Sequence, residues 1–322
     1  MTNTQPATLI HADDYGITAT QAHHILSLSS TCGGNGALNS LSIFANSPAF
    51  PDAASLVKPH WKHGNIQIRL HLNLVEGAPV SRPAEVPLLV DEQGMFANNF
   101  LGLLALSIGA RRKAFFEQLV FECRSQIRQF LSQFPSQKKH MQIDSHQHVH
   151  AIPLVYKALA TALQEEDCEI SLLREPLDPL RLYHPVRREG RQQTQNPTSH
   201  SPEKLPQPSL ANKAKVLLID ALWKKCPKND MPWAQGALLP APLFCGVGLS
   251  GMMGEFNEPL LSSFQREAKQ QNRDLEILFH PVSVPLEECL DPENKPFAEA
   301  CASASRQLEA ERIVAISEWI RA

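Results

Sequence analysis

The sequence predicts an α/β fold in which seven parallel strands form a sheet or a barrel. Three observations support this prediction. Seven strand-like runs are each followed by a helical pattern or a loop, as in chains built from β–α units. The 322 residues are 43% hydrophobic, which is enough for a large core. Polar side chains also gather where the runs end, as expected for parallel strands that carry a site at their carboxyl ends.

The strand-like runs alternate with helical patterns along the chain. The runs occupy residues 7–12, 37–45, 66–74, 140–148, 169–175, 241–247 and 275–282. The clearest helical pattern is 111–134, where apolar residues recur at a spacing of three and four. Similar patterns occupy 155–166, 214–225 and 258–271. This alternation indicates a parallel sheet or barrel and shows no internal repeat.

One segment departs from the alternation. Residues 184–209 are rich in Gln, Ser, Pro and Arg and contain few apolar residues, so they cannot bury much surface. We interpret this segment as a mobile excursion within a single domain that spans residues 1–322.

The composition excludes several classes of protein. The net charge is −3 and charges of both signs are interspersed, so no basic face for nucleic acid is expected. The seven cysteines are scattered and form no C-x-x-C, which is typical of a reducing compartment. No signal peptide pattern is present, and the longest apolar stretch, FLGLLALSIGA, is too short to span a bilayer. We therefore expect a cytoplasmic protein with no transmembrane segment.

Polar clusters lie at or near the ends of five of the seven runs. They comprise Asp13 and Asp14, then His71, then Asp144, His146, His148 and His150, then Arg174 and Glu175, and finally His280. In a parallel barrel these strand ends share one face, so residues distant in sequence would converge there. One Asp and two His from different strands suffice to bind a divalent metal.

A metal would also explain the adjacent carboxylates Asp13 and Asp14. One would bind the cation, which offsets their mutual repulsion, and the other would be free to handle a proton. Neighbouring residues on a regular strand point to opposite faces, so both reach one site only if the strand ends there. The following Tyr15–Gly16 suits such a turn.

The HQHVH segment would place His146, His148 and His150 on one face of a strand, of which we expect one to be a ligand. Each signal also has a structural alternative. The Asp pair could be a surface turn or helix cap, and His71 a hydrogen-bonded core residue. The Arg174–Glu175 pair could be a surface ion pair.

Several segments, in order, resemble the YdjC-like carbohydrate deacetylases, which include the ChbG and HpnK groups. The segments that carry the resemblance are HADDYG, NSLSIFANSPAF, LHLNLVEGAPVS, VPLLVDEQGMF, IDSHQHVH, LLREP and EILFHPVS. The resemblance implies an irregular seven-stranded (β/α) barrel of the deacetylase type. The implied chemistry is hydrolysis of the acetamide of an N-acetylated amino sugar, with release of acetate.

The resemblance also implies roles for individual residues. Asp14, His71 and His146 would bind one divalent metal ion, Mg²⁺ or Zn²⁺, and Asp13 would act as general base. The resemblance is also compatible with a homodimer. The substrate would be a chitooligosaccharide or a lipid-linked N-acetylhexosamine. Two positions depart from the family pattern: Tyr15 replaces Phe, and Val282 replaces the Gly that follows His-Pro.

The remaining site residues follow from their places at strand ends. We expect His280 to protonate the leaving amine without binding the metal, because an unperturbed pKa of about 6.5 makes both protonation states accessible near neutrality. Arg174 would orient the Asp13 carboxylate or bind substrate, and Glu175 and His148 are further candidates for substrate binding.

Two other classes of function fit the same residues. One is a different barrel metallohydrolase, such as a phosphoesterase or a cyclic amidase, which would often use two metals and more carboxylates than the strand ends supply. The other is a catalytically silent sugar-binding or regulatory protein on this scaffold. Acetate release from N-acetylated sugars, with and without a chelator, would separate these classes from a deacetylase.

Overall fold

The computed structural model describes residues 6–184 and 204–321, and its strands form one seven-stranded parallel sheet. The strands are β1 (Thr8–Tyr15), β2 (Ser40–Phe44), β3 (Gln67–Leu72), β4 (Met141–Ser145), β5 (Ile170–Leu173), β6 (Leu243–Cys245) and β7 (Leu275–Phe279). Their order in the sheet is β5-β4-β3-β2-β1-β7-β6. Each strand overlaps one predicted run, so the seven predicted strands and the parallel sheet are confirmed.

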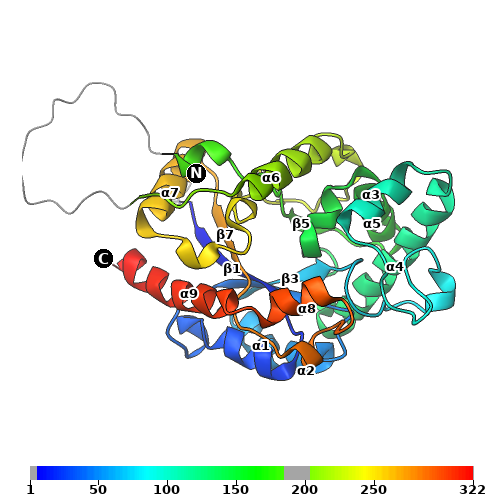
Figure 1. Cartoon of the computed structure of the whole chain (residues 1–322), viewed down its shortest axis with the longest axis horizontal. Coiled ribbons are helices and arrows are strands. Elements are labelled where there is room, and N and C mark those ends of the chain that lie inside the picture. The colour runs from blue at the N-terminus through cyan, green and yellow to red at the C-terminus, as the bar shows by residue number, and fades with distance from the viewer. Residues whose placement is uncertain (1–5, 185–203, 322) are drawn as a thin grey trace, which may run out of the picture.

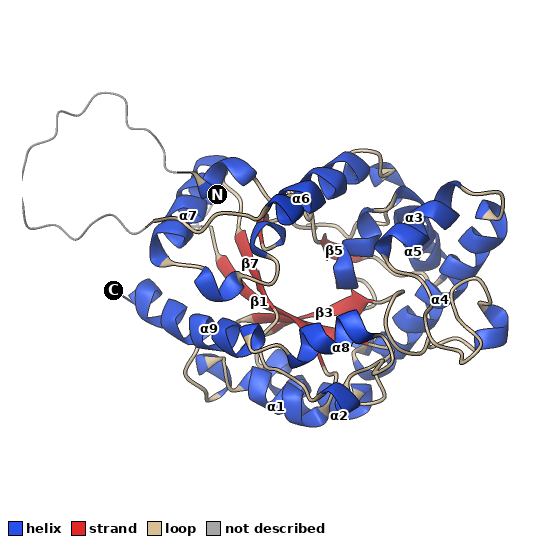
Figure 2. Cartoon of the chain, in the orientation of Figure 1, coloured by secondary structure: helices blue, strands red, loops and turns tan. Residues whose placement is uncertain are grey.

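Helices surround the sheet (Figures 1 and 2). The helices are α1 (Ala19–Leu26), α2 (Phe50–Lys62), α3 (Phe100–Ile108), α4 (Arg112–Gln133), α5 (Pro153–Glu165), α6 (Leu210–Trp223), α7 (Glu258–Gln271), α8 (Lys295–Ala302) and α9 (Ser305–Arg321). The four predicted helices correspond to α4, α5, α6 and α7. The sheet curls into a half-barrel with β5 and β6 as its edges, which agrees with the irregular barrel expected from the resemblance.

Most of the predicted excursion at 184–209 lies outside the described residues. Among the described residues, no helix combines the length and the apolar character needed to cross a membrane.

The inside of the curled sheet is polar, because side chains alternate along each strand. On β3, Ile68 and Leu70 are buried hydrophobic residues, whereas Arg69 and His71 carry the polar groups of the interior. The same alternation on β1 separates apolar Ile10 from polar His11. The sheet therefore encloses a set of charged side chains below the carboxyl ends of its strands.

The carboxyl end of β1 is irregular at the aspartate pair. The pairing of β1 with β2 shifts register between Ala12 and Tyr15, and Asp14 has φ of 59°. A left-handed residue breaks the alternation of faces, which lets Asp13 and Asp14 both contribute to one site. The predicted departure from a regular strand is confirmed, but it occurs at Asp14 itself and continues at Gly16, whose φ is 90°.

The prediction for the HQHVH segment was wrong in its backbone. β4 ends at Ser145, and His146–Ala151 form a short 3₁₀ segment in which Gln147 and His148 have φ of 50° and 57°. His146, His148 and His150 therefore share no strand face. The left-handed pair turns the chain directly after His146, so the three imidazoles point into different surroundings.

The turn after β7 contains a strained residue. Val282 has φ of 71°, and its N–H donates to the carbonyl of Arg306 at 3.2 Å. The left-handed region costs an ordinary residue about 1–2 kcal/mol, and a β-branched side chain is especially unsuited to it. The backbone thus keeps the conformation that Gly would favour, although the residue is Val.

We expect Val282→Gly to raise the free energy of unfolding by about 1 kcal/mol in urea denaturation, since relief of strain exceeds the cost of a more flexible chain. Val284→Gly is the control, because Val284 is buried and has no positive φ. That variant should lose about 2 kcal/mol or more of stability through lost packing. Equal destabilisation by both variants would show that Val282 carries no relievable strain.

Candidate metal centre

Three side chains predicted as ligands lie together at the carboxyl ends of the strands. Asp14 comes from the end of β1, His71 from β3 and His146 from the turn after β4. One potential ligand atom from each lies within 4.8 Å of the others, and all three side chains are buried. Such a cluster of one carboxylate and two imidazoles is a recognised donor set for a divalent transition metal.

The distances within the cluster suit a shared ion. The Asp14 Oδ1 atom lies 3.0 Å from Nδ1 of His146 and 3.5 Å from Nε2 of His71. Ligand atoms at about 2.1 Å from one ion, with angles between tetrahedral and octahedral, are separated by about 3.0–3.4 Å. The two distances from Oδ1 of Asp14 are therefore close to those between ligands of one ion.

A carboxylate behind His71 fixes the direction of its ring. Nδ1 of His71 lies 2.6 Å from Oδ1 of Asp144, which leaves Nε2 facing Asp14. Carboxylates commonly orient metal-binding histidines in this way. Within residues 6–184 and 204–321, neither Nε2 of His71 nor Nε2 of His146 has a hydrogen-bond partner, although both are buried. A cation bound by Nε2 of His71 would remove the cost of that orphaned nitrogen.

Aromatic rings hold the two imidazoles in place. Phe44 makes edge-to-face contacts with both, at ring-centroid distances of 4.9 Å to His71 and 5.3 Å to His146. Phe297 covers His146 from another side at 5.4 Å. These contacts limit ring rotation and exclude water, so the polar atoms of the cluster interact in a low-dielectric environment.

The carboxylates around the cluster favour positive charge at His71. Burial by itself would lower the pKa of His71, but the charges and hydrogen bonds of Asp13, Asp14 and Asp144 outweigh burial and raise it to about 10. Burial would likewise raise the pKa of Asp14, yet His146 and Arg306 hold it well below its usual range. The site therefore attracts a cation, whether a proton or a metal ion.

Asp13 is bound differently from Asp14. Nη1 and Nη2 of Arg174 donate to its two oxygens at 2.9 and 2.8 Å, and the Ser42 hydroxyl donates to Oδ1 at 3.0 Å. Burial would raise the pKa of Asp13, but Arg174 and His71 hold it well below its usual range. Asp13 is thus an ionised carboxylate with a fixed orientation beside the cluster.

The contacts of Arg174 support the predicted role of orienting the Asp13 carboxylate. Its Nε donates to Glu276 at 2.7 Å, its Nη2 lies 2.9 Å from Asp144, and 1% of the side chain is exposed. A guanidinium that is buried and bound to three carboxylates has little capacity left for substrate. The surface ion pair considered for Arg174 is equally inconsistent with this burial.

A second group of possible ligands, His11, Asp13 and Asp144, lies beside the first. Arg174 already binds both carboxylates of this group, and Nη1 of Arg69 lies 3.7 Å from Asp144. Two guanidinium charges at this position would repel a second dication. The geometry therefore favours one metal and weighs against the two-metal hydrolases considered above.

The other predicted substrate-binding residues, Glu175 and His148, have different surroundings. Glu175 pairs with Arg273 at 3.1 Å. Arg273 precedes β7, so Glu175 binds a residue at the amino end of β7, whereas the ligand cluster lies at the carboxyl ends of the strands. His148 is half-buried beside Phe244, with its Nδ1 free of hydrogen bonds among the described residues. His150 is structural, because its ring nitrogens contact the Ser145 hydroxyl at 2.5 Å and the Arg174 carbonyl at 3.0 Å.

His280 follows β7 and is half-buried. Burial lowers its pKa to about 4, against the opposing effect of the Asp14 and Asp13 charges. The expectation that both protonation states are accessible near neutrality was therefore wrong, because His280 is neutral there. A neutral imidazole has to receive a proton before it can protonate an amine.

Four charged residues that contribute to the centre were missed. Arg69 and Glu276 lie inside otherwise apolar strand runs, and Arg306 and Glu309 lie on the buried face of α9. The sequence does contain a signal for them. A charge at a position where the period of a strand or helix demands an apolar residue indicates a buried ion pair.

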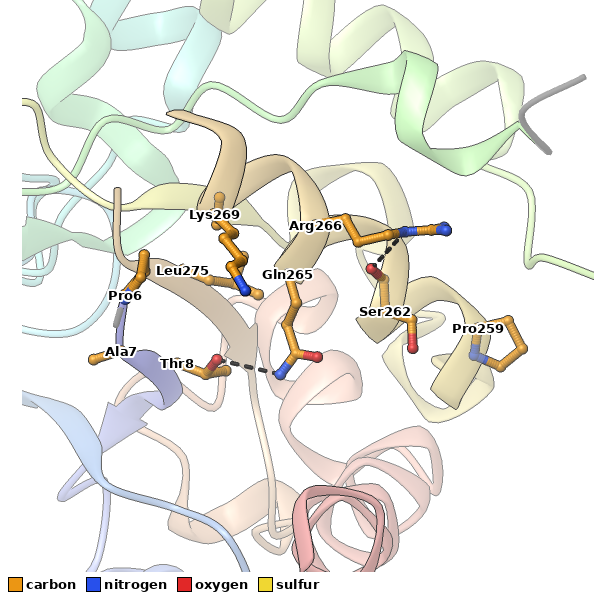
Figure 3. A pocket seen from close by; sticks show the side chains of 10 residues that line it. Pro6, Ala7, Thr8, Pro259, Ser262, Gln265, Arg266, Lys269 and Leu275 are labelled. Atoms are coloured by element: carbon orange, nitrogen blue, oxygen red, sulfur yellow. Dashed lines mark hydrogen bonds between the residues drawn. The ribbon is translucent and has the colours of Figure 1, made fainter. Parts of the chain in front are cut away.

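A separate hollow of about 590 Å³ lies between the start of β1 and helix α7 (Figure 3). Thr8, Gln265 and Lys269 are among its lining residues. It adjoins the amino ends of β1 and β7, opposite the carboxyl ends that carry the ligand cluster. The hollow therefore plays no part in the candidate metal centre.

Comparisons with known proteins identify relatives of this chain. Residues 8–321 match the profile of the YdjC-like protein family. A carbohydrate deacetylase of Geobacillus stearothermophilus is 32% identical over 179 residues, which are 56% of this chain and 62% of the relative. A carbohydrate deacetylase of Danio rerio is 29% identical over 171 residues, which are 53% of this chain and 50% of the relative. The match thus spans about half, or somewhat more, of these curated relatives.

A solved structure shares the fold over almost the whole chain. It is described as a cellobiose-phosphate cleavage protein from Enterococcus faecalis V583. The TM-score is 0.57 at 18% sequence identity, and the superposition covers 99% of this chain and 95% of the other. At this identity the likeness establishes the architecture and carries no statement about activity.

Glu276 should be essential to the stability of the buried charges. Its two oxygens accept from Nε of Arg174 and Nη1 of Arg69, each at 2.7 Å. We expect Glu276→Gln to lower the free energy of unfolding by about 3–5 kcal/mol in urea, since it removes the negative charge that two buried guanidiniums share. Glu85→Gln, which breaks the exposed pair with Arg82, should leave stability unchanged. Similar results for the two variants would contradict this account.

Proposed function

Because the chain belongs to the YdjC-like protein family, we propose that it is a metal-dependent hydrolase that removes the N-acetyl group from an amino sugar and releases acetate. The observation that carries the proposal is the convergence of Asp14, His71 and His146 around one point, with the ionised Asp13 beside them. The names of the two carbohydrate deacetylases support the class of substrate.

The donor set favours Zn²⁺ over Mg²⁺. Imidazole nitrogens suit Zn²⁺, whereas Mg²⁺ prefers six oxygen ligands and retains its water. Asp14, His71 and His146 would hold the ion and leave positions open for water and substrate. When bound, the ion would polarise the acetyl carbonyl and lower the pKa of an attacking water.

Asp13 is the proposed general base, and its Oδ2 atom is the proposed proton acceptor. Oδ1 is occupied by Arg174, Ser42 and His11, at 2.8, 3.0 and 3.1 Å. Oδ2 accepts one described hydrogen bond, from Nη1 of Arg174 at 2.9 Å, so it retains a lone pair for a water proton. The fixed carboxylate would take the proton without first having to rotate.

His280 is the proposed donor of a proton to the leaving amine. Its pKa of about 4 means that it enters the reaction neutral, so the proton that it passes to the amine would be the one that Asp13 takes from the attacking water. His148, also half-buried and left-handed in backbone, is the competing candidate. The amine must be protonated because an amide anion is a very poor leaving group.

Acetate release tests the proposed function directly. Purified protein should release acetate from one or more N-acetylated mono- or oligosaccharides or glycolipids, lose this activity in a chelator, and regain it on addition of Zn²⁺. Acetate should be measured with an enzyme-coupled assay. Release that persists in chelator would contradict metal dependence, and sugar binding without release across the screen would favour a catalytically silent sugar-binding protein.

Substitution of Asp13 and substitution of Asp14 should affect different quantities. We expect Asp13→Asn to keep metal affinity in calorimetric titration and to lower kcat by about 10²–10⁴, the usual contribution of a general base. Asp14→Asn should weaken metal binding itself, because it removes a charged ligand. If Asp13→Asn lost the metal and Asp14→Asn retained it, the assigned roles of the two carboxylates would have to be exchanged.

A further inference from the structure

Helix α9 places two charged residues where its packing calls for apolar ones. Arg306 and Glu309 are 5% and 2% exposed, and they share a face with the buried Ala310 and Ile313. Residues three and four apart on a helix lie on one face. Burying two charged side chains on this face costs free energy unless each has a partner. The partner of Arg306 lies in the metal centre, and that of Glu309 lies in the turn after β7.

Arg306 binds the proposed ligand Asp14 on the side away from the histidines. Its Nη2 donates to Oδ2 of Asp14 at 2.7 Å, and its Nε donates to the Ala300 carbonyl at 3.0 Å. Oδ1 of Asp14, by contrast, faces His146 at 3.0 Å. The guanidinium thus holds one carboxylate oxygen and leaves the other directed at the ligand cluster.

Glu309 binds the backbone of the proposed proton donor. Its Oε2 accepts from the N–H of His280 at 2.6 Å. The Arg306 carbonyl accepts from the N–H of Val282 at 3.2 Å, which anchors the strained residue of the same turn. The first turns of α9 therefore hold the 280–282 turn at two points and Asp14 at a third.

These contacts exceed what packing alone requires. Nη1 of Arg306 is buried and has no hydrogen-bond partner among the described residues, a defect that costs about 1–3 kcal/mol. An aliphatic side chain in this position would avoid that cost. The placement of a guanidinium here, against Asp14, is better explained by an effect on the carboxylate than by stability.

We propose that Arg306 and Glu309 are positioning residues for the deacetylase reaction. Arg306 fixes the orientation of Asp14 for the cation, and Glu309 fixes the position of His280 relative to the substrate amine. Neither residue contacts the reacting atoms. This inference rests on the proposed function, and it predicts that the two residues affect different measurable quantities.

Arg306 is tested by the affinity for Zn²⁺ alone, measured by calorimetric titration of the metal-free protein. Arg306→Met should weaken Zn²⁺ binding by about 10–100-fold, the usual effect of losing a residue that orients a ligand. Arg306→Lys should recover part of the loss, because it keeps the charge but cannot bind Asp14 and Ala300 together. Arg312→Met is the control on the same helix, since Arg312 donates to the Gly254 carbonyl at 2.8 Å. It should bind Zn²⁺ as the wild type does.

Glu309 is tested by the separation of kcat from metal affinity. Glu309→Met should lower kcat by about 10-fold or more with Zn²⁺ affinity unchanged, because only the turn that carries His280 is released. Glu309→Gln keeps an oxygen acceptor for the His280 N–H and should restore kcat to within about threefold of wild type. Circular dichroism and the melting temperature would establish that each variant is folded. If Arg306→Met does not fold, Arg306→Lys replaces it in the Zn²⁺ titration.

The outcomes separate this inference from the proposed function. If the wild type bound no divalent metal and released no acetate, the proposed function would fail. A different result would concern Arg306 alone. If the wild type bound metal and released acetate, and Arg306→Met bound Zn²⁺ with wild-type affinity, Arg306 would not position Asp14. If Glu309→Gln lost as much kcat as Glu309→Met, or if Glu309→Met lost Zn²⁺ as well, the assigned role of Glu309 would be wrong.

Discussion

The structure depends on the neutralisation of charge inside the curled sheet, and Arg174 is at the centre of it. This one guanidinium contacts Asp13, Asp144 and Glu276 within 2.9 Å, and Arg69 shares Glu276 from the far side. Carboxylates buried this deeply would otherwise be protonated or would repel one another. Because Arg174 counters the charge of Asp13, that carboxylate stays ionised and fixed in orientation, and Oδ1 of the neighbouring Asp14 faces the ligand cluster.

Much of this arrangement could be predicted from the sequence, because it follows from two periodicities and one topological rule. Alternating strands and helices predicted the parallel sheet, and the shared face of parallel strand ends predicted that the polar residues after β1, β3 and β4 converge. That rule predicted that polar residues at these ends converge, whereas the choice of Asp14, His71 and His146 as the ligands came from the resemblance to the family. The carbonyl ends of parallel strands are fixed relative to one another by backbone hydrogen bonds, so residue type at those ends is informative.

The remaining features depend on long-range contacts and on local backbone choices that a single sequence leaves open. Left-handed φ angles at Asp14, Gln147 and His148 are imposed by the surrounding structure against the preference of these residues, so the HQHVH segment could not be distinguished from a strand. Arg306 reaches Asp14 across 292 residues of sequence, which no local pattern encodes. The sequence shows that Arg306 and Glu309 occupy an apolar face of a helix, but it does not show which residues they bind.

The distance in sequence between Asp14 and Arg306 has a consequence for synthesis of the protein. A ribosome adds about 5–20 residues per second, so the 292 residues that separate the pair take on the order of 15–60 seconds to make. The nascent chain therefore exposes its aspartate pair long before Arg174 and Arg306 exist. During that interval the carboxylates are hydrated and unoriented, and the chain acquires its finished centre only after α9 has left the ribosome.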